Sequence, residues 1–306
     1  MALDTAAAVA KLRSLTATFD NGVRAAQPFY PTLCTTMTSD GADEEYGGLG
    51  NAPGMREWLG DRVFNSLRAG KFTIDNKTWE SSLGIEKERI DDDRMGIYGP
   101  LMEQLAAEAS YHPDELLIDL IEAGESTACF DGQYFYDNDH VWGDSGTNDN
   151  LLTYDASDHA AVTAAECKAA VEAAVEAMLG FKRDNGKLYH RTAVTKLTKL
   201  VVVFPLALRT AMHTAFESIL FGGGNTNVVL DKPTLVCLPG LASDVKFWVN
   251  KVSDPIKPYI FQARRPLRRQ MKGMDDNEFK DVKFMCDARY NMGYFAWWNS
   301  VQTEFN

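Results

Sequence analysis

The stretch from Lys71 to His140 constrains the fold of this chain most, because four sequence patterns follow one another there without a linker. An alternating, strand-like pattern comes first, and an acidic triplet follows it. A helical pattern comes next, and a segment rich in aromatic residues, aspartate and glycine closes the stretch. Strands and helices in such close succession predict a mixed fold in which both pack on a common core.

Residues 72–90 carry the pattern of a β-hairpin, in which two alternating strands flank a polar turn at 75–77. One side of the second strand carries an apolar row made of Trp79, Leu83 and Ile85. An isolated two-stranded ribbon is only marginally stable in water, so this row must find a surface to lie on. We therefore expect an adjacent subunit to cover it. A surface hairpin packed on the core of its own chain is the alternative.

Apolar residues at helical spacing occupy 101–109 and 114–124, with a proline between the two stretches. A proline inside a helix removes a hydrogen bond and crowds the preceding turn. The pattern therefore predicts either one long helix kinked at His112 or two helices in series. Pro100 suits the first helical turn, and Gly124 suits the end of the helix.

The C-terminal half alternates between helical and strand-like patterns. Residues 164–179 predict an alanine-rich amphipathic helix ended by a glycine, and a tight turn is expected at 183–186. Residues 200–204 indicate a buried strand and 206–221 a helix. Further strands are expected at 228–230, 234–238 and 245–249. This alternation predicts a compact α+β domain at about 155–255.

Composition excludes several classes of protein. The formal net charge of −12 argues against a general nucleic-acid binder, because attraction to phosphates needs clustered lysine and arginine. The five cysteines form no closely spaced pair, so neither a disulfide framework nor a zinc ribbon is indicated. The N-terminal residues lack the basic flank and apolar core of a secretory signal. The longest apolar stretch, 200–208, is less than half of a membrane span, so we expect a soluble protein.

One acidic cluster could carry chemistry. The segment from Asp131 to Asp144 offers carboxylates and His140 as ligands, and a metal-dependent hydrolase built on it is our second hypothesis. The pattern of an EF-hand calcium loop fails there, because Val141 and Asn148 occupy its fifth and twelfth positions.

Two further motifs favour structural roles. The triplet Asp91–Asp93 could bind a divalent cation together with substrate phosphates, but it also complements the positive end of a helix dipole. The tetrapeptide at 143–146 copies the nucleophile motif of trypsin-like proteases, yet no histidine occupies the expected upstream setting. We therefore assign no catalytic residue, no metal ligand and no cofactor to this chain.

Basic residues concentrate between 264 and 272 in an otherwise acidic chain. The arginines of this patch are Arg264, Arg265, Arg268 and Arg269. They form either a solvated loop or a surface that pairs with acidic residues of a neighbouring copy, such as Asp91–Asp93. Our hypothetical interface consists of these four arginines together with Trp79, Leu83 and Ile85.

Four motifs occur in a family-specific order over about ninety residues. They are NAPGMREWLGDR at 51–62, IDNKTWE at 74–80, DDD at 91–93 with GIYGP at 96–100, and DGQYFYDNDH at 131–140. In this order they resemble the major head subunit of Mu-like phages and prophages, the T protein family. The match is clear from about Phe19 to Asn150 and loose in the C-terminal half.

The resemblance implies the α+β fold of tailed-phage major capsid proteins. That fold has an N-terminal arm, an extended hairpin loop, a peripheral domain with a long spine helix, and an axial domain that meets its symmetry mates. We expect the arm at 1–61, the hairpin loop at 62–93, the peripheral domain at 94–154 and 256–306, and the axial domain at 155–255.

The resemblance also implies a function. A protein of this family would be a major capsid (head) protein that self-assembles into the icosahedral shell enclosing phage DNA, without enzymatic activity. Its expected partners are copies of itself in pentamers and hexamers, together with scaffold or protease, portal and decoration proteins. We expect it to enclose double-stranded DNA without reading its sequence. It would assemble in the bacterial cytoplasm, remain in the virion and bind no membrane.

Overall fold

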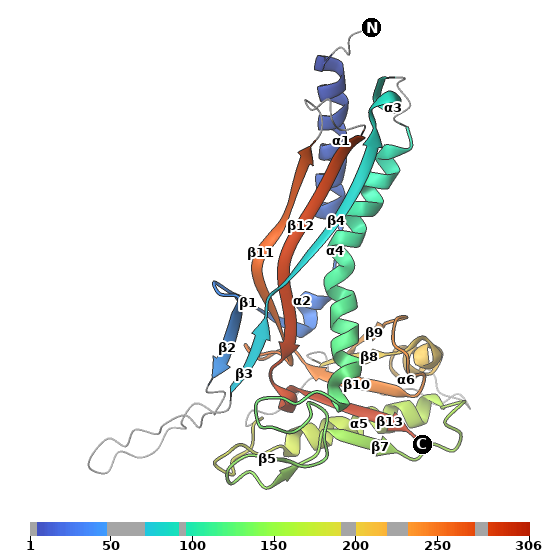
Figure 1. Ribbon diagram of the computed structural model, residues 1–306. Coiled ribbons are helices and arrows are strands. Elements are labelled where there is room, and N and C mark those ends of the chain that lie inside the picture. Colours follow the sequence, from blue (N-terminus) through green and yellow to red (C-terminus); the bar gives the residue numbers. More distant parts are fainter. Residues whose placement is uncertain (1–4, 48–70, 92–95, 191–199, 219–231, 273–280) are drawn as a thin grey trace, which may run out of the picture.

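The computed structural model describes residues 5–47, 71–91, 96–190, 200–218, 232–272 and 281–306. The molecule has two parts, an elongated wing and a wider base (Figure 1). Long strands and two helices run along the wing, and a second sheet with two further helices forms the base. The N-terminal helix lies at the far end of the wing, whereas the last residues lie in the base.

A four-stranded sheet in the order β1-β11-β12-β4 forms one side of the wing. Its strands are β1 (Cys34–Thr38), β11 (Tyr259–Lys272), β12 (Asp281–Tyr294) and β4 (Lys77–Glu86). β12 is antiparallel to both β11 and β4, and β1 is parallel to β11. Every second side chain of β12 is buried, because the pleat turns alternate residues toward the helices.

Two helices, α1 (Thr5–Ala25) and α4 (Tyr98–Glu122), cover that sheet. Their buried residues form one apolar cluster with β4 and β12, which includes Phe19, Met102 and Phe284. Burying such a side chain fully stabilises the fold by about 1.5–3 kcal/mol. The close approach of the helices requires Gly22, since a Cβ there would lie 2.7 Å from the Cβ of Ala106.

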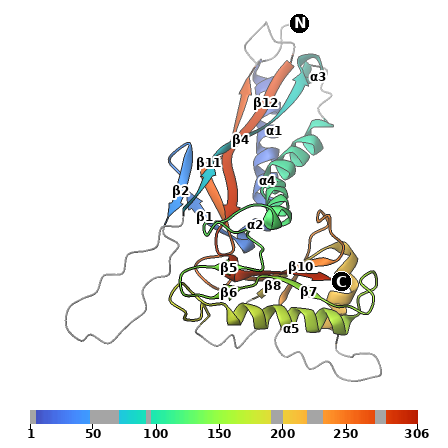
Figure 2. The same cartoon turned by 60° about the horizontal axis from the view of Figure 1, so that its bottom comes forward.

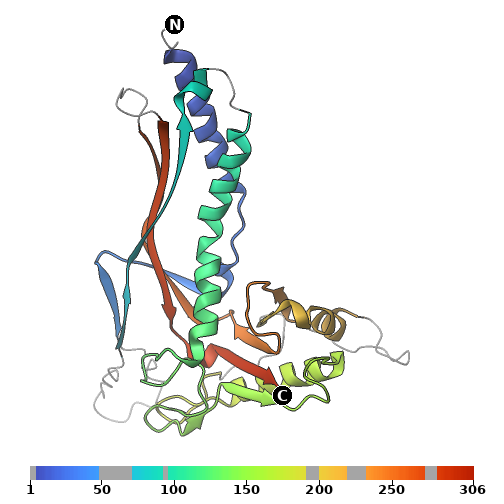
Figure 3. The same ribbon diagram turned by 45° about the vertical axis from the view of Figure 1, so that its right-hand side comes forward.

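The sequence left open whether one or two helices follow Pro100, and the structure has a single helix. α4 runs through Pro113 and spans the length of the wing (Figure 3). Pro100 lies in its first turn, as expected. Gly124 lies in the short 3-10 helix η1 (Ala123–Glu125), where a Cβ would collide with the ring of Tyr136. Glycine is therefore needed here for a close contact.

The base contains a five-stranded sheet in the order β7-β13-β10-β8-β9. Its strands are β7 (Leu151–Tyr154), β13 (Ser300–Phe305), β10 (Lys246–Lys251), β8 (Leu200–Phe204) and β9 (Thr234–Cys237). All five residues of β8 are buried, as its uninterrupted apolar sequence predicts. The helices of the base are α5 (Ala164–Gly180), which runs along one face of this sheet (Figure 2), and α6 (Arg209–Glu217).

Several predictions for the base are confirmed. The alanine-rich helix ends at Gly180, and the predicted turn has Gly186 at a φ of +69°, inside the bridge between Lys182 and Leu188. The expected strand at 228–230 and most of the aspartate triplet lie outside the described residues. The remaining short elements are α2 (Tyr30–Leu33), α3 (Lys87–Asp91), β5 (His140–Val141), β6 (Thr147–Asn148), η3 (Leu206–Leu208) and η4 (Trp297–Asn299).

The predicted hairpin between 72 and 90 is wrong in its pairing. Both strands exist, but β3 (Lys71–Asp75) pairs with β2 (Asp43–Gly47), whereas β4 pairs with β12. An alternating pattern defines a strand and its buried side, but it does not specify the partner strand. Here β12 offers a longer apolar face than β3 does, so β4 continues away from β3 along the wing.

The start of α5 generates a prediction about acid stability. Thr163 and Glu166 form a capping box, and the Glu166 carboxylate also accepts hydrogen bonds from the backbone and hydroxyl of Ser157. The hydroxyl of Thr163, then the Ser157 and Thr163 backbone amides, lower the pKa of Glu166 to about 2. The carboxylate therefore stabilises the fold fully above the ordinary glutamate pKa of about 4.3, and this contribution disappears as the pH falls toward 2.

We expect Glu166→Gln to lower the melting temperature at pH 7. The difference in melting temperature between the variant and the unmodified chain should shrink as the pH falls from about 4.3 to 2. Glu172→Gln is the matched control, because Glu172 is an exposed residue of the same helix. Melting curves followed by circular dichroism across this pH range test the prediction. An equal effect of both substitutions at every pH would refute it.

Candidate functional site

Trp79, the first residue of the predicted interface row, packs against its own chain. Its indole N–H donates a hydrogen bond of 3.0 Å to the carbonyl oxygen of Tyr290, and its ring lies 4.4 Å from the ring of His112. His112 Nδ1 and the Tyr290 hydroxyl share a hydrogen bond of 2.8 Å. Trp79 thus joins β4, β12 and α4, while its side chain stays partly exposed.

Leu83 and Ile85 lie on the same side of β4 as Trp79. Leu83 is half-buried, whereas Ile85 is fully buried in the apolar cluster of the wing. The helices of the same chain therefore cover Ile85 without any neighbour. Contact of the row with an adjacent subunit stays a prediction, and it concerns the exposed parts of Trp79 and Leu83.

The four arginines belong to a strand, so the expectation of a solvated loop is wrong. β11 carries irregularities of register between Ala263 and Arg268, where Pro266 interrupts the ladder. Proline lacks the amide hydrogen that regular pairing needs, which explains why the sequence here did not look like a strand.

Each arginine has an acidic partner within its own chain. Arg265 and Arg268 both bind Asp287 on β12, with 2.9 Å between Arg268 Nε and the carboxylate. The hydrogen bond from Arg268 lowers the pKa of Asp287. The other two pairs are Arg264 with Asp40 at 3.3 Å and Arg269 with Asp20, where Arg269 Nε lies 2.7 Å from the carboxylate.

These partners were not visible in the sequence. Asp20 lies on α1 and precedes Arg269 by 249 positions, and no local pattern links the two. The side chains of all four arginines nevertheless remain between 32% and 50% exposed. Their pairing with a neighbouring copy stays a prediction.

Of the acidic cluster, the fold brings Asp131 and His140 together. His140 Nδ1 lies 2.7 Å from Asp131 Oδ2, both side chains are fully buried, and Cys129 Sγ lies 2.8 Å from the other carboxylate oxygen. Burial opposes ionisation of Asp131, but hydrogen bonds from His140, Cys129 and the Gln133 amide keep its pKa below the usual range. Burial raises the pKa of the Cys129 thiol.

These three side chains are the group of potential metal ligands found within the described ranges. Asp137, Asp139 and Asp144, on which the hydrolase hypothesis also relied, are not part of the group. The Asp131 carboxylate already accepts hydrogen bonds from both of its neighbours, which gives it a structural role. The ring of His140 stacks on Trp297 at 4.1 Å, so the cluster ties the loop after α4 to η4.

Asn150 strengthens the same junction, and sequence reasoning missed it. Its side-chain amide is fully buried, donates to the carbonyl oxygens of Phe135, Trp297 and Ser300, and accepts from the Asp137 amide.

Ser145 of the protease-like tetrapeptide is buried as well. Its hydroxyl accepts a hydrogen bond from the Trp142 amide and donates to the Gly146 carbonyl oxygen, as in a local turn.

Solved structures with this fold are capsid subunits and particle-forming proteins. The PhiM1 mature capsid matches with a TM-score of 0.59 at 13% identity, over 92% of this chain and 88% of that chain. The procapsid of bacteriophage JBD30 matches with a TM-score of 0.56 at 23% identity, over 96% of this chain and 75% of that chain. The virus-like particle of Pyrococcus furiosus matches with a TM-score of 0.53 at 10% identity, over 95% of this chain and 98% of that chain. These similarities define the fold.

The particular family follows from the sequence. The family model of the Mu-like prophage major head subunit gpT matches residues 9–165, which is half of the chain, so the chain belongs to this family. The Mu-like prophage FluMu major head subunit of Haemophilus influenzae is 38% identical over 149 residues, 48% of each chain. The major capsid protein of Escherichia phage Mu is 34% identical over 122 residues, 40% of each chain. The matched part thus spans less than half the length of these relatives.

The family confirms the resemblance found in the four sequence motifs, and the matched residues include all of them. Within the described part of the chain, no helix is long and apolar enough to cross a membrane.

The pairing of Arg269 with Asp20 generates a second prediction. Arg269→Glu places two carboxylates side by side and should destabilise the isolated chain by about 0.5–1 kcal/mol, a small value because the pair is partly exposed. The combination Asp20→Arg with Arg269→Glu should recover most of that loss. Urea unfolding of the single and double variants measures the coupling. Arg13→Glu, an exposed site on the same helix, is the control. Equal losses from Arg13→Glu and Arg269→Glu would contradict an intrachain pair.

Proposed function

We propose that this chain is a major capsid protein that self-assembles into the icosahedral shell enclosing the DNA of a Mu-like phage or prophage. The observation that carries this proposal is membership of the gpT head-subunit family over residues 9–165. The fold supports it, because the similarity to capsid subunits extends over more than 90% of the chain. It therefore includes the C-terminal half, which the family model does not match.

We assign the parts of the fold to capsid roles as follows. The wing, with α4 as the spine helix, serves as the peripheral domain, and the base serves as the axial domain. Because β13 lies inside the base sheet, the proposed axial domain gains residues 300–305 in addition to 155–255. The proposed arm includes α1 and β1, which pack on the wing of the same chain. The paired strands β2 and β3 belong to the proposed hairpin loop, so arm and loop overlap before residue 62.

The proposed contacts between subunits use side chains that their own chain covers incompletely. Trp79 and Leu83 are half-buried, and the side chains of the β11 arginines are partly exposed. Repeated contacts of this heterologous kind, in which different patches of two copies meet, close rings when the rotation between copies permits. Ile85 supports the fold of its own chain and contributes no exposed surface.

Further partners follow from the same proposal. One solved capsid of the JBD30 phage is decorated with minor capsid protein trimers, and we propose that this chain also binds a decoration protein. Scaffold or protease and portal proteins would take part in assembly. With a net charge of −12, the shell would enclose double-stranded DNA without binding it tightly. Assembly would take place in the bacterial cytoplasm, and the product would be the virion capsid.

Assembly of the purified chain tests the proposed function. We expect rings, tubes or closed shells in light scattering and negative-stain electron microscopy when the chain is concentrated, alone or with a scaffold. Measurements at several salt concentrations are needed, because salt screens weak electrostatic contacts between copies. A chain that stays strictly monomeric under all of these conditions would overturn the proposal.

Trp79→Ala separates a role in assembly from a role in folding. The substitution removes a hydrogen bond and ring contacts within the chain, and we expect the monomer to lose about 1–3 kcal/mol because the ring is only partly buried. Trp142→Ala is the matched control, a half-buried tryptophan of the base that packs on Phe130.

If Trp79 also anchors a neighbouring subunit, its removal should reduce particle yield well below that of Trp142→Ala at similar melting temperature. Melting curves and particle yields measured on both variants decide the matter. Particle yields that follow monomer stability alone would mean that Trp79 acts only in folding.

A further inference from the structure

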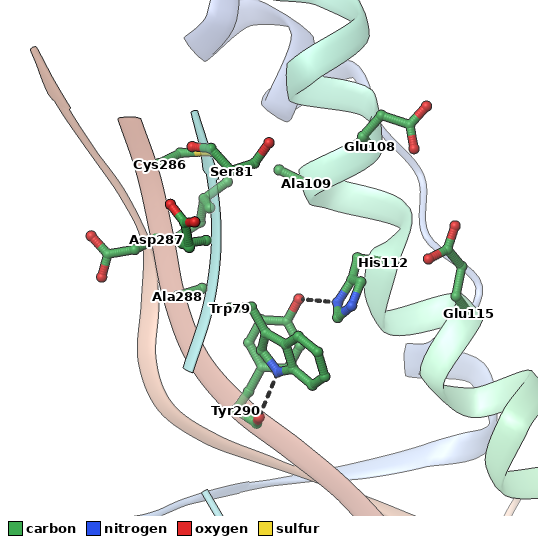
Figure 4. A pocket seen from close by; sticks show the side chains of 12 residues that line it. Trp79, Ser81, Glu108, Ala109, His112, Glu115, Cys286, Asp287, Ala288 and Tyr290 are labelled. Atoms are coloured by element: carbon green, nitrogen blue, oxygen red, sulfur yellow. Dashed lines mark hydrogen bonds between the residues drawn. The ribbon is translucent and has the colours of Figure 1, made fainter. Parts of the chain in front are cut away.

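A pocket lies between α4 and the two strands β4 and β12 (Figure 4). It has a volume of about 200 Å³. Trp79 faces the helix from β4, Tyr290 lies behind it on β12, and His112 approaches from α4. The mutual hydrogen bonds of these three residues hold their rings in place, so the pocket is built before anything enters it.

Two carboxylates of α4 line the same pocket. Glu108 and Glu115 project from the part of the helix that carries His112, and both are exposed. No ion pair to either is formed by the residues that the structure describes. Asp287 also lines the pocket, but its carboxylate points away from α4 and binds Arg265 and Arg268. Glu80 of β4 is exposed and also lines the pocket, without an ion pair to the described residues, so negative charge lies on both the helix side and the strand side.

The chemistry of the lining favours an organic cation. Glu108 and Glu115 lie seven positions apart, about two turns of α4, and Trp79 offers its indole ring in the same pocket. An ammonium or guanidinium group is attracted by carboxylates without a fixed coordination geometry and lies favourably over an indole ring.

We propose that this pocket receives a lysine or arginine side chain from a second copy of the chain. The inference rests on the proposed self-assembly and names one contact within it. Copies with a net charge of −12 repel each other, so assembly needs places where a cation of one copy meets carboxylates of the next. Arg13 and Lys77 are exposed, and neither forms an ion pair with the described residues.

Neutralising the two carboxylates tests this contact. Glu108→Gln with Glu115→Gln should raise the concentration needed for assembly by about tenfold, since charge-assisted hydrogen bonds are lost at every copy. The matched control is Glu103→Gln with Asp119→Asn, which removes the same charge from exposed sites of the same helix. Melting curves of both double variants should match that of the unmodified chain, because all four side chains are exposed.

A photo-crosslinking residue at position 115 identifies the occupant directly. Assembly of an equal mixture of isotopically heavy and light chains, followed by mass spectrometry, separates links between copies from links within one copy. We expect links between copies to a peptide whose contacting residue is lysine or arginine.

Two results would overturn the inference while leaving assembly intact: equal assembly of the two double variants, or crosslinks confined to one copy. A link to a different protein in a complete assembly mixture would also overturn it. If the unmodified chain forms no particles, the proposed function fails, and this contact fails with it.

Discussion

The structure depends on one strand, β12, because it contacts both neighbouring strands and both helices of the wing, and the chain continues from it into the base. It pairs with β11 on one edge and β4 on the other, and its buried side chains meet α1 and α4. Its last residues pass through η4 directly into β13, an interior strand of the base sheet. The buried His140–Trp297 stack fixes this passage. Wing and base are thus held by a continuous backbone and by one buried core, which includes Ile121 of α4 and Val301 of β13.

Charge is arranged around this framework in two ways. Along β11 the arginines find carboxylates that their own chain supplies, so a concentrated basic sequence becomes a set of local ion pairs. Along α4, Glu108 and Glu115 line a pocket and form no ion pair with the residues that the structure describes. Exposed ion pairs contribute little stability each, which makes the arginine pairs more useful for fixing geometry than for strengthening the fold. In the proposed assembly, these carboxylates would bind a cation of a neighbouring copy.

The sequence predicted individual elements well and their partners poorly. Periodicity identified the helix at 164–179 and the buried strand at 200–204, because each depends mainly on its own residues. It could not reveal that β3 and β4 belong to different sheets, since pairing is decided by apolar faces far away in the chain. The irregular pairing at Pro266 also kept the sequence from showing that the four arginines belong to strand β11. The site was predicted in the same uneven manner: Asp131 and His140 were singled out, whereas Cys129 and Asn150 became visible only through the fold. Function was accessible because a family preserves motifs in order, and no chemical pattern in the residues alone would have identified it.

The place of β13 has a consequence for biosynthesis. The strand lies between β10 and β7, so both of these strands have an unpaired edge until residues 300–305 have left the ribosome. An unpaired strand edge readily captures other chains. The N-terminal elements that form α1 and α4 emerge long before that moment, yet the base sheet cannot close. The base sheet of a nascent chain is therefore incomplete until β13 has emerged. Chains that terminate before residue 300 lack an interior strand of the base and cannot complete this sheet.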